Sequence, residues 1–276
     1  MADNNQSPQH GQTPEPVTLR DGAAEIVQTL RRSLFMLPQV ALTPFIVVFL
    51  VQGGAFLASG GAMMELENET PQISPLAIAA LPVIILAYAV FMVDWLRLLL
   101  LGPSPETTRP RTTLRSRDFR FLFRCLLVIL MGFLGALPVA LLAPALVPIG
   151  GIVLVAILSV VLAVTTMLAV GLVLPGTAID REFSFGDSWR ATREVLSSLL
   201  GLVLIVVLPV HLLAMLMAML YGATMGMHGL MVPLLALSIA MEFIELAVVA
   251  TLLAVVYRRR VGVDQTNPGG GGANGS

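Results

Sequence analysis

Six long apolar stretches constrain the fold of this chain more than any other feature. Each exceeds the roughly 20 residues that a helix needs to cross the hydrocarbon core of a bilayer. Lipid offers no partner to backbone N–H and C=O groups, so each stretch is expected to be helical. The stretches cover residues 34–58, 76–101, 121–146, 150–174, 196–221 and 231–257. The chain is therefore predicted to be all-α, a polytopic membrane bundle of six transmembrane helices.

Composition supports this prediction and sets the domain boundaries. Hydrophobic residues make up 57% of the 276 residues, charged residues 12%, and the mean hydropathy is +0.88. A soluble domain carries about 25% charged residues. Residues 20–260 are predicted to form one six-span domain. Residues 1–19 are rich in Asn, Gln and Pro and residues 261–276 are rich in Gly, so both are expected to be disordered tails.

The positions of the arginines predict the orientation in the membrane. All 16 basic residues are arginine. Fourteen of them precede the first span, lie in the second and fourth loops, or follow the sixth span, and the other three loops contain none. The remaining two, Arg97 and Arg124, lie within the second and third spans. Basic residues near span ends remain in the cytoplasm. We therefore expect a multi-pass membrane protein with both termini in the cytoplasm. The net charge of −1 gives no reason to expect nucleic acid as a partner.

The polar passage "LPGTAIDREFSFGDSWRATREV" separates the fourth span from the fifth. Pro175 is expected to end the fourth span. Ser184 and Asp187 have the spacing of a capping box, which predicts that a helix begins there. This helix places Phe185 and Trp189 on an apolar face, so we expect it to lie along the cytoplasmic membrane surface. A catalytic loop is the alternative, but the passage contains no His, no Cys and no nucleophile–base pair. The residues expected at the interface are Phe185, Trp189, Arg190 and Arg193.

Similar amphipathic segments are predicted before the first and third spans. Ile26, Val27 and Leu30 form an apolar stripe ahead of the first span. Before the third span, Arg117 and Arg120 fall on one helical face together with Arg124. We expect Arg117 and Arg120 to contact anionic lipid headgroups, where each arginine contributes about 1 kcal/mol.

Two motifs resemble those of an uncharacterised group of bacterial, chiefly alphaproteobacterial, six-span inner-membrane proteins. "WLRLLLLG" is similar to their W-H-R-F-V-L-L-G-E motif, and "LPGTAIDREFSFGDSWRATR" to their L-P-A-x-A…W-x-x-T-R motif. The group is similar in layout to the YciC-like proteins and to the membrane region of some glycerophosphodiester phosphodiesterases. Leu96 and Pro103 stand where that group has His and Glu. The resemblance implies the six-span fold and a location in a bacterial inner membrane, but no activity.

Two carboxylates in the sixth span, Glu242 and Glu245, stand out. They are three residues apart and so project from one face of the helix. One ionisable group at the bilayer centre costs about 2.5–3.5 kcal/mol on insertion scales. The pair is interpreted either as a proton or cation site or as a neutral, hydrogen-bonded pair that holds helices together. Candidate ionisable partners in other spans are His211, Asp94, Arg97 and Arg124. For Asp94 and Arg97, an ion pair with each other is the favoured alternative.

A methionine- and histidine-rich segment follows the fifth span and includes Met225, Met227 and His228. Thioether and imidazole groups suit Cu(I), so these residues are remote candidates for a copper site. Methionine is also a common packing residue, and that interpretation is favoured. No metal or other cofactor is expected.

Taken together, these patterns favour a non-enzymatic membrane protein that interacts with lipids, with a membrane-protein partner or with copies of itself. No recognisable catalytic set occurs, which favours the absence of enzyme activity. The first alternative is a small secondary transporter coupled through Glu242 and Glu245. The remote alternative is copper handling.

Overall fold

The computed structural model describes residues 19–58, 64–65, 72–73, 75–104, 113–146, 151–223 and 228–262. Within them, six helices are long and apolar enough to cross a membrane. The predicted all-α, six-span class is thereby confirmed. The two predicted terminal tails lie largely outside the described residues.

The helices follow one another in the order expected from the apolar stretches. A short helix and one 3-10 turn precede the first long helix: α1 (Leu19–Ser33), η1 (Leu34–Met36) and α2 (Leu37–Ala58). The middle of the chain forms α3 (Pro75–Leu101), α5 (Ser116–Leu146), α6 (Ile152–Gly171), α7 (Val173–Ala178) and α8 (Phe185–Thr192). The remainder forms α9 (Leu196–Leu202), the π-helix η3 (Val203–Val207), α10 (Leu208–Ala223) and α11 (His228–Arg260). Two antiparallel strands, β1 (Met64–Glu65) and β2 (Gln72–Ile73), lie between α2 and α3.

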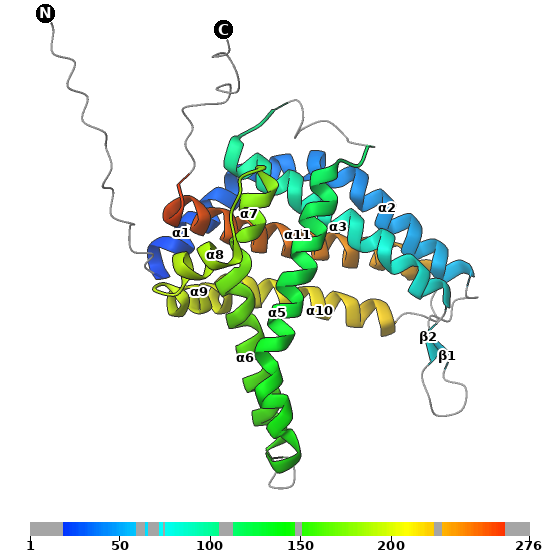
Figure 1. Cartoon of the computed structure of the whole chain (residues 1–276). Helices are drawn as coiled ribbons and strands as arrows, with labels where there is room; N and C mark the ends of the chain where they lie inside the picture. Colours follow the sequence, from blue (N-terminus) through cyan, green and yellow to red (C-terminus); the bar gives the residue numbers. More distant parts are fainter. Residues whose placement is uncertain are drawn as a thin grey trace, which may run out of the picture.

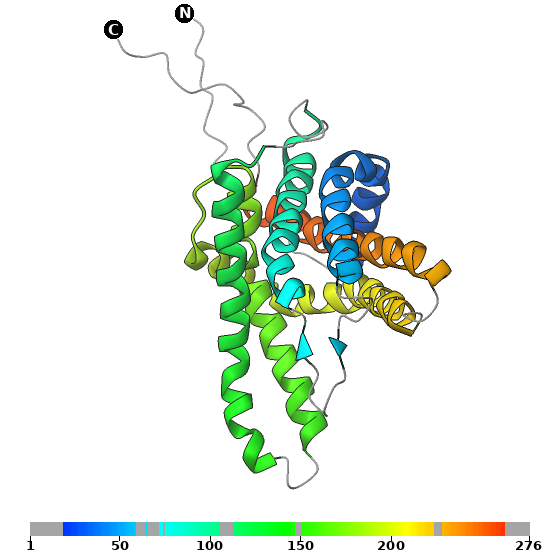
Figure 2. The ribbon, with the colours of Figure 1, turned by 90° about the vertical axis from the view of Figure 1, so that its right-hand side faces the viewer.

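Helices α11 and α3 form the centre of the bundle. In an 18-residue apolar stretch of each span, 61% of the residues are buried in α11 and 56% in α3. The share is 22% or less in the other four spans. Helix α11 contacts α10, α3, α1 and α2. The α5–α6 hairpin stands out from this body, as both ribbon views show (Figures 1 and 2).

Two glycines in α5 let the hairpin close. A Cβ atom on Gly132 would lie 2.6 Å from Cγ of Met167, and one on Gly135 would overlap the hydroxyl of Thr166. No real side chain fits so close to its neighbour. The sequence "GFLGA" predicts this tight helix contact through its small residues, and the structure contains it.

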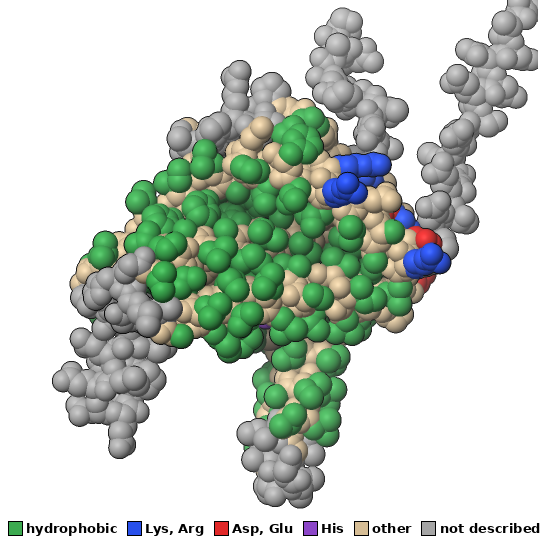
Figure 3. Space-filling view, turned by 180° about the vertical axis from the view of Figure 1, so that it is seen from behind, with side chains coloured by type: hydrophobic (Ala, Val, Ile, Leu, Met, Phe, Trp, Pro, Cys, Tyr) green, Lys and Arg blue, Asp and Glu red, His purple; other side chains and the backbone are tan. Residues whose placement is uncertain are grey.

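The surface is divided between an apolar expanse and a charged end. Figure 3 shows hydrophobic side chains over the body and over the projecting hairpin, with arginine and acidic side chains gathered at one end. At that end α1 and α11 are joined by Arg259, whose Nε donates to Oε2 of Glu25 at 2.6 Å. This division is the one that a bilayer imposes on a multi-pass protein.

Several helix boundaries differ from the predicted ones. Pro175 does not end the fourth span: the helix breaks at Leu172 and resumes as α7 to Ala178. The break has a physical cause, because Pro175 has no N–H to donate to the carbonyl of Gly171. The basic lead-in to the third span is the first turns of α5 rather than a separate helix. The π-helix η3 ends just before Pro209, where a wider turn accommodates the missing N–H.

Candidate functional site

A group of arginines converges on the residue that follows α7. The end of α7 forms a Schellman motif, in which the N–H of Arg181 bonds to the carbonyl of Gly176 at 2.9 Å and that of Asp180 to Thr177 at 3.1 Å. This motif needs a left-handed residue, and Asp180 has φ 58°. Glycine is the usual residue there, so an aspartate in this place points to a role for its carboxylate.

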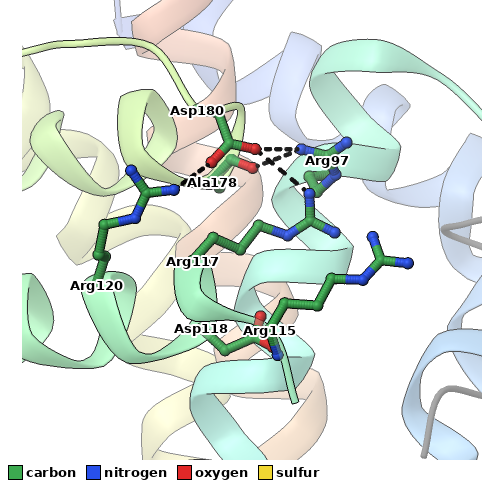
Figure 4. Close-up of polar contacts among 7 residues, drawn as sticks. All are labelled: Arg97, Arg115, Arg117, Asp118, Arg120, Ala178 and Asp180. Atoms are coloured by element: carbon green, nitrogen blue, oxygen red, sulfur yellow. Dashed lines mark hydrogen bonds and ion pairs between the residues drawn. The ribbon is translucent and has the colours of Figure 1, made fainter. Parts of the chain in front are cut away.

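Three guanidinium groups surround the Asp180 carboxylate (Figure 4). Arg120 lies 2.9 Å from Oδ1, while Arg97 and Arg117 each lie 3.4 Å from Oδ2. The side chains of Arg97 and Arg117 are 14% and 9% exposed, whereas that of Arg120 is 64% exposed. Arg97 also donates to the carbonyl of Ala178 at 3.0 Å, at the negative end of α7. We call Arg97, Arg117, Arg120 and Asp180 the Asp180 cluster; its net charge is positive.

Arg124 and Arg115 extend the basic region on either side of this cluster. Arg124 donates to the hydroxyl of Thr177 at 2.7 Å, and so holds α5 against α7. The backbone N–H of Arg115 donates to the carboxylate of Asp118 at 2.7 Å, which caps the start of α5. The guanidinium group of Arg115 points away from Asp180 (Figure 4).

The predicted capping box is present at the start of α8. The hydroxyl of Ser184 accepts from the backbone N–H of Asp187 at 3.1 Å, and the carboxylate of Asp187 accepts from the N–H of Ser184 at the same distance. Hydrogen bonds from the hydroxyl and the N–H of Ser184 lower the pKa of Asp187, and the charge of Arg190 lowers it further. The sequence therefore predicts this helix start correctly.

Helix α8 packs against α6 through polar side chains. The face buried against α6 is formed by two small polar residues, Ser188 and Thr192, both fully buried. Ser188 accepts from the N–H of Leu172 at 3.1 Å and donates to the carbonyl of Ala169 at 3.0 Å. Trp189 is 49% exposed. The hydroxyl of Thr192 donates to the same carbonyl of Ala169, at 2.8 Å.

Three consecutive arginines at the end of α11 tie this charged end together. Arg258 donates to the carbonyl of Leu99 in α3 at 2.9 Å. Arg259 pairs with Glu25 of α1, and Arg260 donates to the carbonyl of Ala191 at 2.9 Å. A hydrogen bond from Arg260 and its charge lower the pKa of Glu194. These arginines therefore act as ties between helices.

Inside the bundle, the two glutamates of α11 have partners on different helices. Tyr88 of α3 donates a hydrogen bond to Glu242. Glu245 lies 2.8 Å from Nδ1 of His211 in α10. The side chain of His211 is 55% exposed and that of Glu245 is 25% exposed. The pair thus links α11 to α3 on one side and to α10 on the other.

The structure brings together some of the predicted ionisable residues and separates others. Of the four candidate partners of the glutamates, His211 reaches Glu245, while Arg97 and Arg124 contact the end of α7 instead. Asp94 is buried at 7% exposure. Arg117 was expected at the lipid interface but is buried, because its guanidinium group turns inward to Asp180.

Two residues of these clusters escape sequence reasoning. Asp180 carries no motif of its own, and its position after a helix end is a signal only once α7 is known. Tyr88 is an ordinary residue of an apolar span.

The candidate copper ligands cannot be placed. Met225 and Met227 lie outside the described residues, as does the side chain of His228. Within the described part of the chain, no group of three His, Cys, Asp or Glu residues is placed to hold a metal ion.

Comparisons with known proteins add no family assignment. No protein-family model matches the chain, and neither a curated protein nor a solved structure matches it. Conclusions about function therefore rest on the geometry.

Proposed function

We propose that this chain is a non-enzymatic, multi-pass protein of the bacterial inner membrane that binds anionic phospholipid headgroups at its arginine-rich end. Both termini lie in the cytoplasm in this proposal. The six apolar helices and the one-sided distribution of arginine support the location. Family membership in the uncharacterised six-span group remains part of the proposal and rests on the two quoted motifs alone.

The single observation that carries the lipid-binding proposal is the exposure of arginine side chains at this end of the molecule. Arg120 pairs with Asp180 and yet is 64% exposed. Arg190 of α8 is 72% exposed and pairs with Asp187 across one helical turn. Guanidinium groups bind phosphate oxygens in a bidentate manner, so such a surface at the headgroup level favours anionic lipids.

A thermal-stability experiment tests this proposal. The protein in neutral detergent is heated with added phosphatidylglycerol or phosphatidylcholine of the same chain length, at low and high salt. We expect phosphatidylglycerol to raise the Tm more, and this difference to shrink with salt because exposed charges are screened. Equal effects of both lipids at low salt would contradict the proposal.

Charge variants identify the residues responsible. Changing Arg120 and Arg190 together to Gln should remove most of the preference for the anionic lipid. The matched control changes both to Lys, which keeps the charge and should retain a weaker preference. Reporter fusions at Gly61 and Gly229 test the orientation, and a cytoplasmic signal at either would contradict it.

A second function, transport coupled to a proton or cation, is favoured by one observation. His211 and Glu245 form a polar pair within the apolar part of two spans, and more than half of the His211 side chain is exposed. Ionisable residues at this depth commonly line a pathway. Changing both Glu242 and Glu245 to Gln separates this function from a purely structural role.

A further inference from the structure

The first helix, α1, has an inner face that packs on the bundle and an outer face that stays open. On the inner face, Ile26 is fully buried and Glu25 pairs with Arg259 of α11. On the outer face, Arg31 and Arg32 of the last turn are both exposed. The bundle therefore fixes the position of α1 and leaves its last turn open to the surroundings.

The guanidinium groups of Arg31 and Arg32 are free to bind a ligand. Neither residue makes a hydrogen bond or an ion pair with another residue in the part of the chain that the structure describes. The arginines of the Asp180 cluster and those at the end of α11, by contrast, donate to groups of the protein itself. Arg31 and Arg32 thus keep all five N–H donors of each guanidinium group for a partner from outside.

The length of the first span places these two arginines at the level of the lipid headgroups. Helix α1 runs through η1 into α2 (Figure 1), and the whole course Leu19–Ala55 has 37 residues. A bilayer core needs roughly 20 residues, which, counted back from Ala55, reach Met36. Arg31 and Arg32 lie about one turn before that point, where the phosphate groups of a phospholipid lie.

Two exposed hydrophobic side chains lie between the arginines and the first span. Leu34 is 48% exposed and Phe35 is 67% exposed. Residues three and four apart are neighbours on a helix, so both follow Arg31 along the same side of the chain. Basic residues next to an exposed aromatic suit the boundary between headgroups and acyl chains. An acidic protein segment would pair with the arginines but would leave Phe35 uncovered, so a phospholipid fits this surface better.

We propose that the end of α1 binds the phosphate of an anionic phospholipid through Arg31 and Arg32, while Leu34 and Phe35 contact the first part of its acyl chains. The inference rests on the proposed preference for anionic headgroups and adds to it a located site, separate from the Asp180 cluster. The guanidinium groups donate hydrogen bonds to the phosphate oxygens, and the two apolar side chains select a lipid over a free anion.

Tryptophan quenching at position 35 tests this location. Phe35→Trp is combined with Trp189→Phe, so the remaining native tryptophan is Trp95, which is fully buried. The full chain is placed in vesicles of equal parts phosphatidylglycerol and phosphatidylcholine, with one or the other lipid brominated on its acyl chains. We expect phosphatidylglycerol to be enriched at position 35 about fivefold or more, as the attraction of one arginine to an anionic surface provides. Equal quenching by the two lipids would overturn the proposal.

Charge variants in this background identify the arginines responsible. Arg31→Gln with Arg32→Gln should make the two lipids quench equally, and the fold should survive because both side chains are exposed. The matched control, Arg120→Gln with Arg190→Gln, removes two exposed arginines elsewhere and should leave the enrichment at position 35 unchanged. A preference that survives the first pair of changes, or that is lost with the second pair, would overturn the proposal.

A second reporter position tests whether the enrichment is local. Leu57→Trp, again with Trp189→Phe, places the reporter near the other end of α2, on a side chain that is 78% exposed. We expect the two brominated lipids to quench it equally. The same enrichment at position 57 would show that phosphatidylglycerol gathers around the whole protein, and the proposal would be wrong.

Inorganic phosphate separates a lipid site from a site for a free anion. At equal ionic strength, phosphate should reduce the enrichment at position 35 no more than chloride does; a larger reduction would show that the anion alone is bound and would overturn the proposal. Arg31 and Arg32 tie no helices together, so failure of this site leaves the Tm difference between the two lipids intact. Failure of the proposed function abolishes that Tm difference in the wild type.

Discussion

Arg120 donates from Nη2 to Oδ1 of Asp180 at 2.9 Å and so joins α5 to a residue 60 positions further along the chain. Asp180 is at the same time the left-handed residue that ends α7. An L-residue in that conformation costs roughly 1–2 kcal/mol. The ion pairs with Arg97, Arg117 and Arg120 offset this cost, and the cluster therefore joins three helices through one strained position.

Substitutions of Asp180 separate its charge from its backbone. Asp180→Asn tolerates the left-handed conformation but removes the charge, and should destabilise the protein by about 1–2 kcal/mol, because Arg117 stays buried without a carboxylate. Asp180→Gly removes the same charge, but glycine adopts the left-handed conformation without strain. Asp180→Ala removes the charge and keeps the strain. Thermal unfolding in detergent should rank Gly above Asn and Asn above Ala. An Ala variant as stable as Gly would contradict this account.

Ser188 should matter more to the region between α6 and α9 than the large aromatic beside it. Ser188→Ala removes the hydroxyl that accepts from the buried N–H of Leu172 and that donates to the carbonyl of Ala169. The free energy of unfolding should fall by about 1–3 kcal/mol. Trp189→Ser removes a side chain that is half exposed and should change the detergent-solubilised protein little. Limited proteolysis of residues 179–195 measures both. Faster cleavage in Trp189→Ser than in Ser188→Ala would reverse the assignment.

The sequence predicts correctly those features that depend on local patterns. The six spans follow from apolar length alone, because a bilayer requires about 20 residues per helix. The capping box at Ser184 follows from local spacing, since its partners are three residues apart. Both features are local and involve no distant part of the chain.

The remainder depends on contacts between distant segments. The break at Leu172 is signalled by Pro175, but the hydrogen bonds that Ser188 makes there, with the N–H of Leu172 and the carbonyl of Ala169, come from a residue 16 positions further along the chain. Periodicity places Arg117 on a basic face, yet its guanidinium group turns to Asp180, 63 residues away. For Glu242 and Glu245 the sequence offers several partners, and only packing selects Tyr88 and His211.

The α5–α6 contact should respond sharply to one methyl group. Gly135→Ala places a Cβ atom onto Thr166 and should destabilise the protein by about 1–3 kcal/mol, as overpacking does. Adding Thr166→Ala removes the colliding hydroxyl and should restore part of the loss. The matched control is Gly54→Ala, where a Cβ atom meets no neighbour within 4 Å. Equal Tm values for the two single variants would show that the hairpin is not closed through Gly135.

Acid should loosen the start of α8. The pKa of Asp187 is lowered below its ordinary value of 3.8 by its hydrogen bonds with Ser184. A carboxylate with a lowered pKa stabilises the folded state above its ordinary pKa, and this contribution is lost as the pH falls through the folded-state value. Below about pH 4 the Tm of the wild type should therefore fall more steeply than that of Asp187→Asn, whose side chain does not titrate. Parallel curves for the two proteins would contradict a role for the ionised cap.

Glu242 and Glu245 connect α11 to Tyr88 of α3 and to His211 of α10. In Glu242→Gln, the amide oxygen still accepts from Tyr88, so the fold should be preserved. Glu242→Leu should lower the free energy of unfolding by about 1–3 kcal/mol, because the Tyr88 hydroxyl loses this acceptor. Glu245→Gln, with His211 unchanged, should likewise preserve the fold.

If the glutamates only hold α3, α10 and α11 together, the double Gln variant is stable and the host grows as the wild type does. If they couple transport, the double Gln variant is equally stable but proton or cation flux in proteoliposomes is lost, because an amide carries no exchangeable charge. The matched control is Tyr88→Phe, which removes the hydrogen bond to Glu242 and leaves both carboxylates in place. It should lower the Tm while any proton or cation flux is retained. Stability that falls in the double Gln variant, with flux per folded molecule unchanged, would reject coupling and assign the pair to assembly of the bundle.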